Sequence, residues 1–259
     1  MDLGLEGRVA VVFGGGGGIG RGIAASLAAE GARVAVADIS AEALAQTVAE
    51  IEQDVLPVRV DLSDHESITA GLEQVVAELG TVSVLVNNTG GPPPGPAAGV
   101  ATTQWERYFH IMVSSLMHAT DLVLPGMRAS GWGRIITSTS YGAIVPIPNL
   151  GISNALRPAL LGWSKTVAGE VAADGVTVNV VVPGRIATAR ALEVDRKEAE
   201  RDGVPVEKVA AASAATIPVG RYGTVQEYGD VVAFLASDRA GYVTGSVVRV
   251  DGGMIPSIF

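Results

Sequence analysis

The residues best suited to chemistry in this chain form a run of glycines near its start. A predicted strand, Arg8–Phe13, leads directly into Gly14–Gly20, in which only Ile19 is not glycine, and a helical stretch follows. Glycines allow a tight turn and let backbone N–H groups approach a pyrophosphate at the positive end of a helix. The run fits two registers of the dinucleotide fingerprint, and both need the strand and helix found here. The candidate contacts are Gly14, Gly16, Gly18, Ile19 and Gly20.

One acidic residue bears on which dinucleotide is bound. Asp38 closes the second predicted strand, Arg33–Ala37. A carboxylate at this place accepts hydrogen bonds from ribose hydroxyls and repels a 2′-phosphate. Arg21 and Arg33 could in principle serve NADP(H), but Arg21 begins the helix and Arg33 lies at the opposite end of the strand. We therefore expect NAD(H) as the cofactor, with NADP(H) as the less favoured alternative.

Composition limits the other classes of function. The chain has 259 residues, 48% of them hydrophobic, which is ample material for a core. Its net charge of −9 disfavours nucleic acids and anionic membranes as partners, because their phosphates would be repelled. The chain has no cysteine, and its three histidines lack the spacing of metal ligands, so we expect neither thiolate catalysis nor a metal site. With no signal-peptide pattern and no long apolar run, we expect a cytoplasmic protein.

Short β-rich runs alternate with longer helical patterns, which is typical of a parallel sheet with crossover helices. The predicted strands are Arg8–Phe13, Arg33–Ala37, Val55–Val60, Val82–Val86, Arg134–Ser138, Val176–Val181 and Ser246–Val250. The predicted helices are Ile19–Glu30, Ala41–Gln53, Asp64–Leu79, Thr103–Ala129, Ile152–Ala173 and Val225–Ala236. Two of these are expected to begin with capping boxes, Ser63 with Glu66 and Thr224 with Glu227. We expect residues 1–259 to form one α/β Rossmann domain.

Two longer segments interrupt this alternation. Residues 90–99, rich in glycine and proline, follow the fourth strand, and residues 187–220, rich in alanine and charge, follow the sixth. The second segment could form small helices over a cleft. Ligands of open α/β sheets bind beyond the carboxyl ends of the strands, where both segments start. We expect both to face substrate, with ordinary surface crossings as the alternative.

The chain resembles the short-chain dehydrogenase/reductase family over nearly its whole length. Beyond the glycine loop, the resemblance is carried by Asp61-Leu62, Asn87-Asn88-Thr89-Gly90, Pro183-Gly184-x-x-x-Thr188 and Asp251-Gly252-Gly253. It implies a doubly wound seven-stranded sheet with strand order 3-2-1-4-5-6-7, a nicotinamide cofactor and a homotetramer. The further cofactor contacts that it implies are Asp61, Leu62, Asn88, Gly90, Pro183, Gly184 and Thr188. An apolar tail, Met254–Phe259, also favours a homo-oligomer.

The catalytic positions depart from the family pattern. That pattern is a serine, then a tyrosine with a lysine four residues on, and often an asparagine from the preceding helix. Ser140 aligns with the serine, whereas Ile152, Leu156 and Met112 align with the tyrosine, the lysine and the asparagine. Isoleucine and leucine donate no proton, and losing a positioned acid typically costs ~10²–10⁴-fold in rate. The resemblance is therefore to an atypical branch, similar to β-ketoacyl-carrier-protein reductases.

Three polar side chains are the candidates for the missing chemistry. Ser140 offers a hydroxyl that suits any carbonyl substrate. Tyr141 follows it at the end of the fifth strand, where its hydroxyl could reach the nicotinamide; a surface or interface tyrosine is the alternative. Arg157 lies one residue beyond Leu156, rotated by about 100° on the helix, so it cannot copy the lysine. It could hold a carboxylate or an oxyanion, or be an arginine of the helix surface or a dimer interface.

Three functions remain open at this point. The first is an NAD(H)-dependent oxidoreductase for a small alcohol/carbonyl pair. The second is a lyase, isomerase or hydratase on the same scaffold, and the third is a non-catalytic dinucleotide-binding or oligomer-partner subunit. Ser140 and the segment Pro183–Thr188 favour the first function, because both match the family pattern on the side of the site where the nicotinamide would bind.

Overall fold

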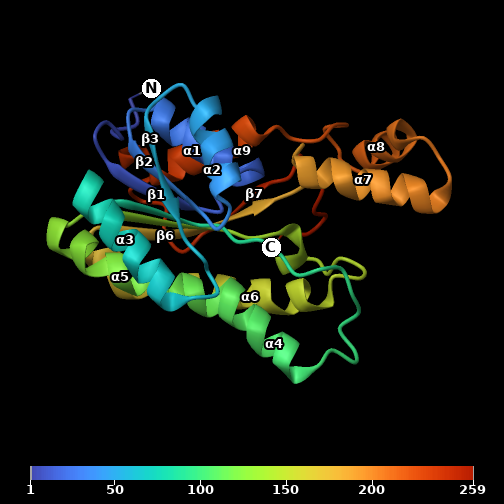
Figure 1. The fold of residues 1–259 in the computed structure, drawn as a ribbon, viewed down its shortest axis with the longest axis horizontal. Helices are drawn as coiled ribbons and strands as arrows, with labels where there is room; N and C mark the ends of the chain where they lie inside the picture. Colours follow the sequence, from blue (N-terminus) through green and yellow to red (C-terminus); the bar gives the residue numbers. More distant parts are fainter. Residues whose placement is uncertain (1, 259) are drawn as a thin grey trace.

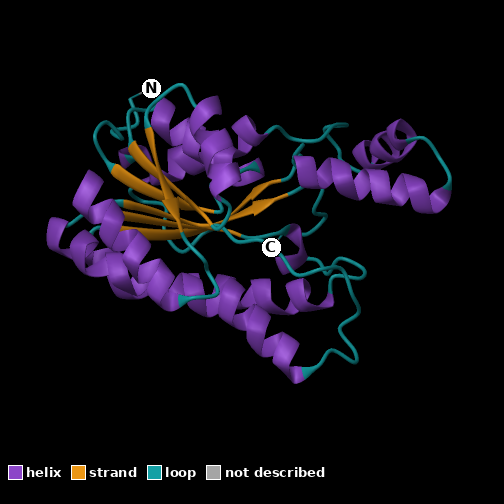
Figure 2. Cartoon of the chain, viewed as in Figure 1, coloured by secondary structure: helices purple, strands orange, loops and turns teal. Residues whose placement is uncertain are grey.

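A parallel sheet runs through the middle of the molecule, with helices on both faces (Figures 1 and 2). The computed structural model describes residues 2–258. Within this range the strands are β1 (Val9–Phe13), β2 (Arg33–Asp38), β3 (Val55–Arg59), β4 (Val84–Asn87), β5 (Gly133–Ser138), β6 (Val176–Pro183) and β7 (Val247–Val250). They pair in the order β3-β2-β1-β4-β5-β6-β7. The predicted fold class and strand order are confirmed.

The sheet reverses its winding direction beside β1. This strand pairs in parallel with β2 on one side and with β4 on the other. Every residue of β1, β4, β5 and β6 is buried, because helices cover both faces and leave only the strand ends open. The crevice beyond the carboxyl ends of β1 and β4 is the place where open α/β sheets bind ligands.

Helices of two layers cover the sheet. One layer contains α1 (Gly18–Ala29), α2 (Ala41–Glu50) and α9 (Val225–Ala236). The other contains α3 (His65–Leu79), α4 (Thr102–Phe109), α5 (Ser115–Ser130) and α6 (Gly151–Val171). Helices α4 and α5 correspond to one predicted helix, which a π-helical turn at His110–Ser114 divides. Among residues 2–258, no helix combines the length and apolar character needed to cross a bilayer.

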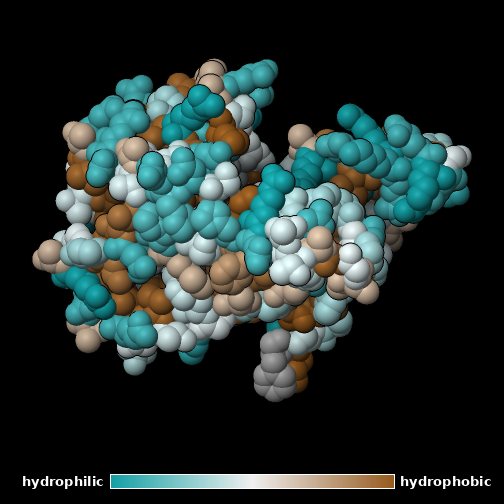
Figure 3. Space-filling view, turned by 60° about the horizontal axis from the view of Figure 1, so that its bottom comes forward, coloured by the Kyte–Doolittle hydropathy of each residue, from teal (hydrophilic) through white to brown (hydrophobic). Residues whose placement is uncertain are grey.

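The segment 187–220 forms an arm of two helices, as expected. They are α7 (Ala189–Asp202) and α8 (Val206–Ala215). Figure 1 shows that this arm stands away from the sheet, and in Figure 3 it is a largely hydrophilic lobe that a notch separates from the body. Residues 90–99 contain neither helix nor strand, and they are tied to the start of α6 by a bridge between Gly95 and Leu150. Both segments border the carboxyl ends of the strands.

One of the two predicted capping boxes is wrong. Helix α3 begins after Asp64, whose carboxylate accepts a hydrogen bond from the N–H group of Glu66. Ser63 instead donates its hydroxyl and its N–H group to the carboxylate of Asp61, so it is not available as the cap. The capping box of Thr224 and Glu227 at α9 is confirmed.

Candidate functional site

The glycine loop joins β1 to α1 at the reversal point of the sheet. Gly14 and Gly18 have positive φ angles of 61° and 52°, which favour glycine. A Cβ atom on Gly20 would overlap the carbonyl oxygen of Gly14, and one on Gly15 would lie 2.9 Å from the carbonyl oxygen of Val12. No side chain caps the first turn of α1, so its N–H groups are available to an anion. The loop has the space and polarity that a pyrophosphate needs.

Asn88 supports this loop from the neighbouring strand. Its side-chain amide donates a hydrogen bond of 3.2 Å to the carbonyl oxygen of Phe13. A Cβ atom on Gly14 would lie 2.6 Å from the Nδ2 atom of Asn88, so the two segments are in close contact. Asn88 therefore positions the loop, and its direct contact with a cofactor stays a prediction.

Asp38 faces the glycine loop from the end of β2. Its carboxylate accepts hydrogen bonds from the N–H groups of Gly16, at 3.2 Å, and Ser40, at 3.0 Å. Arg21 reaches the same loop, but its guanidinium forms an ion pair with Glu50 and also donates to Thr47. The negative charge at the end of β2 therefore has no ion-pair partner among the described residues.

The other predicted cofactor residues lie beyond the carboxyl ends of three strands, β3, β4 and β6. Beyond β3, the carboxylate of Asp61 accepts hydrogen bonds from the hydroxyl and N–H groups of Ser63, and both lower the pKa of that carboxyl. Leu62 is half-buried against the core beneath the sheet. Gly90, just beyond β4, is exposed, and a Cβ atom there would meet no other atom within 4 Å. Space for a bound group therefore remains beyond β4.

The segment after β6 meets the glycine loop. Pro183 ends β6, and a Cβ atom on Gly184 would lie 2.6 Å from the Cα atom of Asp251. Thr188 caps α7 by accepting a hydrogen bond from Ala191. A Cβ atom on Gly18 would lie 3.5 Å from the methyl carbon of Thr188. The structure thus brings Thr188 against the glycine loop.

Ser140 and Tyr141 lie just beyond β5, separated from it by Thr139. The Oγ atom of Ser140 accepts a hydrogen bond of 3.2 Å from the N–H group of Gly142, which leaves the hydroxyl proton free to be donated. The half-buried ring of Tyr141 packs against Val180 and Val182 of β6. Within the described residues, its hydroxyl forms no hydrogen bond. Both hydroxyl groups are therefore available to a substrate.

A network of one ion pair and its hydrogen bonds connects the arm to the segment after β6. Arg185 lies 3.1 Å from a carboxylate oxygen of Asp195, and the hydroxyl of Tyr222 donates to the other oxygen at 2.8 Å. Asp195 is fully buried, and Tyr141 lies close enough to Arg185 to interact with it electrostatically. Sequence reasoning did not single out this network, because its members are separated in the chain and come together only when the arm folds back.

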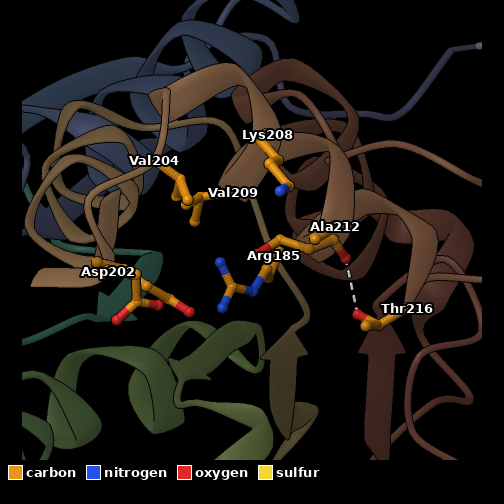
Figure 4. A pocket seen from close by; sticks show the side chains of 9 residues that line it. Arg185, Asp202, Val204, Lys208, Val209, Ala212 and Thr216 are labelled. Atoms are coloured by element: carbon orange, nitrogen blue, oxygen red, sulfur yellow. Dashed lines mark hydrogen bonds between the residues drawn. The ribbon is translucent and has the colours of Figure 1, made fainter. Parts of the chain in front are cut away.

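A pocket of about 480 Å³ opens on the arm itself. It lies between α7 and α8, and Arg185 lines it together with Asp202 and Lys208 (Figure 4). None of the residues that we expect to bind cofactor or perform catalysis lines this pocket. We therefore place the candidate site at the strand ends.

Helix α6 presents two different faces at its start. Ile152 and Leu156, which the resemblance aligned with the tyrosine and lysine positions, pack with Met112 in an apolar cluster. Arg157 turns toward the strand ends, where its Nη2 atom donates a hydrogen bond of 3.4 Å to the carbonyl oxygen of Thr89. The arginine is only 7% exposed, so it does not lie on the helix surface.

Ser153 shares the face of Arg157, because it lies four residues earlier on the same helix. It is 6% exposed, and sequence reasoning missed it. The spacing of buried residues gave no clear signal, because Leu160, Ser164 and Ala168 are four residues apart. Traced back toward the start of α6, that spacing leads to Leu156 and Ile152 rather than to Arg157 and Ser153, and all four are buried.

The charge of Arg157 has no acidic partner among the described residues. Its Nε atom is buried and forms no hydrogen bond. Burial and then the charge of Arg190 lower the pKa of Arg157 to about 10, so the side chain stays charged at neutral pH. A buried cation without a carboxylate is costly, and such a group is often part of a binding site.

Comparison with protein families gives one match over almost the whole chain. The family described as "Enoyl-(Acyl carrier protein) reductase" matches residues 15–255. Among curated proteins, 3-oxoacyl-(acyl-carrier-protein) reductase FabG of Escherichia coli K12 is 37% identical over 258 residues, covering 97% of this chain and 99% of the relative. Nodulation protein G of Azospirillum brasilense is 34% identical over 255 residues, covering 95% and 98%.

Solved structures show the same fold at similar identity. L-sorbose reductase from Gluconobacter frateurii, complexed with NADPH and L-sorbose, has a TM-score of 0.94 and 32% identity, with complete coverage of both chains. A single-residue variant of actinorhodin polyketide ketoreductase with NADPH has a TM-score of 0.89 and 32% identity, covering 95% of this chain and 97% of the other.

Proposed function

This chain belongs to the short-chain dehydrogenase/reductase family, and from this we propose that it is an NAD(H)-dependent oxidoreductase for a small alcohol/carbonyl pair, working with a non-standard catalytic site. The observation that carries the proposal is the shared position of the polar groups. Ser140 follows β5 and Arg157 reaches the end of β4, next to the glycine loop after β1. Two similar proteins, FabG of Escherichia coli and L-sorbose reductase of Gluconobacter frateurii, are named as reductases.

Each of three side chains has a role in this proposal. A bound nicotinamide would supply hydride to the carbonyl carbon, or accept it in the reverse direction. Ser140 donates a hydrogen bond to the carbonyl oxygen, and Tyr141 gives that oxygen its proton. Arg157 holds a further oxygen of the substrate and so fixes its orientation. Hydroxyl groups at the end of β5 thus replace the acid that Ile152 and Leu156 cannot provide.

The proposed cofactor is NAD(H), although the sorbose reductase and the actinorhodin ketoreductase are described with NADPH. The argument rests on Asp38, whose carboxylate at the end of β2 would lie where a 2′-phosphate is placed. Arg21, the cation nearest in sequence to the loop, is held by Glu50 and Thr47. A 2′-phosphate would therefore meet a negative charge without a free arginine to offset it.

We expect NADH to bind at least about tenfold more tightly than NADPH, because only NADPH places a phosphate beside Asp38. The substitution Asp38→Asn removes the charge at nearly constant size, so it should narrow that difference. Isothermal calorimetry with both dinucleotides measures it, and Asp54→Asn, an exposed carboxylate just before β3, is the matched control. Equal binding of the two dinucleotides by the unchanged protein would remove the argument from Asp38.

We also propose a homotetramer, as the family resemblance implies. The apolar tail gives this proposal only partial support. Ile255 is buried within its own chain, in a cluster with Val180 and Val182, and so does not need a partner subunit to cover it. Ile258 remains 88% exposed, whereas Phe259 lies outside the described residues. Light scattering at micromolar concentration should give four times the mass of one chain, and the mass of a monomer would contradict the proposal.

A non-catalytic dinucleotide-binding subunit is the second candidate. The observation that favours it is the apolar surroundings of Ile152 and Leu156, which carry no acid. A lyase or isomerase on this scaffold has no specific residue in its favour. Location in the cytoplasm, a single domain over residues 1–259 and the absence of nucleic-acid and membrane partners remain predictions.

A further inference from the structure

Two arginines from different elements meet beside Gly91, three residues after the Asn88 that supports the glycine loop. Arg157 comes from α6 and Arg190 from the first turn of α7. A Cβ atom built on Gly91 would lie 3.7 Å from the Nη2 atom of Arg157 and 3.5 Å from the Nη2 atom of Arg190. Both guanidinium groups therefore face the same space at the carboxyl end of β4.

Neither guanidinium group has a carboxylate within ion-pair distance among the described residues. The buried Nε atom of Arg157 has no hydrogen-bond partner. On the helix that carries Arg190, Glu193 forms its ion pair with Lys197, at 2.6 Å. Arg190 is exposed and interacts electrostatically with Glu193, whereas Arg157 is buried without an acidic partner in the described part of the chain. Folding alone therefore does not explain the buried charge of Arg157, which the nearby charge of Arg190 makes less favourable still.

The position of Arg190 on its helix also indicates that this arginine has no stabilising role in α7. A cation in the first turn of a helix opposes the helix dipole, so Arg190 does not stabilise α7. Its side chain instead reaches toward Gly91 and Arg157. The arrangement costs stability at both ends of the pair, and an anion between the two groups would relieve both costs.

Resting on the proposed function, we propose that Arg157 and Arg190 bind a carboxylate of the substrate, so that the enzyme acts on small oxo acids and the corresponding hydroxy acids. Ser140 and Tyr141 then hold the carbonyl oxygen while the arginines hold the carboxylate, and two anchors orient the substrate. A pyrophosphate is the other anion expected nearby, but the uncapped first turn of α1 already provides its site.

The test uses two ligands that share a ketone and differ in charge, with one additional methyl group on the uncharged ligand. Acetoacetate and its uncharged methyl ester present the same ketone, and with NAD⁺ as the cofactor neither can be reduced. Calorimetry of the NAD⁺ complex should show acetoacetate binding at least about tenfold more tightly than methyl acetoacetate. Arg190→Gln should abolish most of this difference, whereas Arg196→Gln, an exposed arginine on the same helix, should leave it unchanged.

Several outcomes would overturn the carboxylate site. Equal binding of the two ligands, no binding of acetoacetate, or an unchanged preference in Arg190→Gln would each do so. If Arg190→Gln lowered the affinity for NAD⁺ by as much as it lowered the affinity for acetoacetate, Arg190 would be assigned to cofactor binding instead. Reduction of uncharged ketones by NADH, with no dependence on Arg190, would overturn only the carboxylate site and would leave the proposed oxidoreductase function in place.

Discussion

Replacing Tyr141 by phenylalanine is expected to lower kcat by about 100-fold or more, the usual effect of removing a positioned acid. The substitution keeps the ring that packs against Val180 and Val182 and removes only the hydroxyl. NADH affinity should stay nearly unchanged, because the predicted dinucleotide contacts lie at other strand ends. Steady-state kinetics and a fluorescence titration with NADH measure the two quantities. Tyr242→Phe, a fully exposed tyrosine, is the matched control.

Ser140→Ala separates the possible results of that experiment. Unchanged turnover in Tyr141→Phe would eliminate Tyr141 as the acid and leave water or Arg157. Unchanged turnover in Ser140→Ala as well would show that the corner after β5 is not used. If both variants lose activity while NADH still binds, the two hydroxyl groups belong to the reacting centre.

Replacing Arg157 by methionine is expected to move stability and activity in opposite directions. The variant removes a charge that is 7% exposed and has no acidic partner among the described residues. Unfolding by urea should therefore show a gain of about 1–4 kcal/mol, the range seen when buried ion pairs are replaced by apolar residues. The ratio kcat/KM should fall by about 10- to 100-fold, because a charge-assisted hydrogen bond to substrate is lost.

This combination distinguishes a substrate-binding arginine from a structural one. A structural Arg157 would give the opposite pattern, with lower stability and an unchanged kcat/KM. Arg196→Met, on the exposed side of α7, controls for the general effect of removing one positive charge. Arg157→Lys keeps the charge but not the forked donor geometry, so it should recover only part of the activity.

The positions of the strands and the glycine loop were predictable from the sequence, because both depend on patterns that are local in the chain, whereas the order of the strands followed only from the family resemblance. Continuous apolar runs mark buried strands, and the run Gly14–Gly20 lies between one of them and a helix. The arm at 187–220 was predictable as helical for the same reason. The direction of the arm was not predictable, because it depends on the contacts of Arg185 with Asp195 and Tyr222.

Side-chain direction on α6 was the main uncertainty at the site. A shift of one residue rotates a helix position by about 100°, so alignment by similarity could not separate Leu156 from Arg157. The histidines show the same limit. His65 stacks on His118, with ring centroids 4.4 Å apart, and lies 4.5 Å from the ring of His110, although no spacing in the sequence indicates this cluster.

The most direct test of the proposed function is whether bound NADH is consumed by a small ketone. Absorbance of the reduced nicotinamide should fall when the protein is mixed with NADH and a panel of small ketones and oxo acids, and the Ser140→Ala variant should lose this activity. The account predicts turnover with at least one compound of the panel. NADH that binds but is consumed by none of them would contradict it and would favour a non-catalytic dinucleotide-binding subunit.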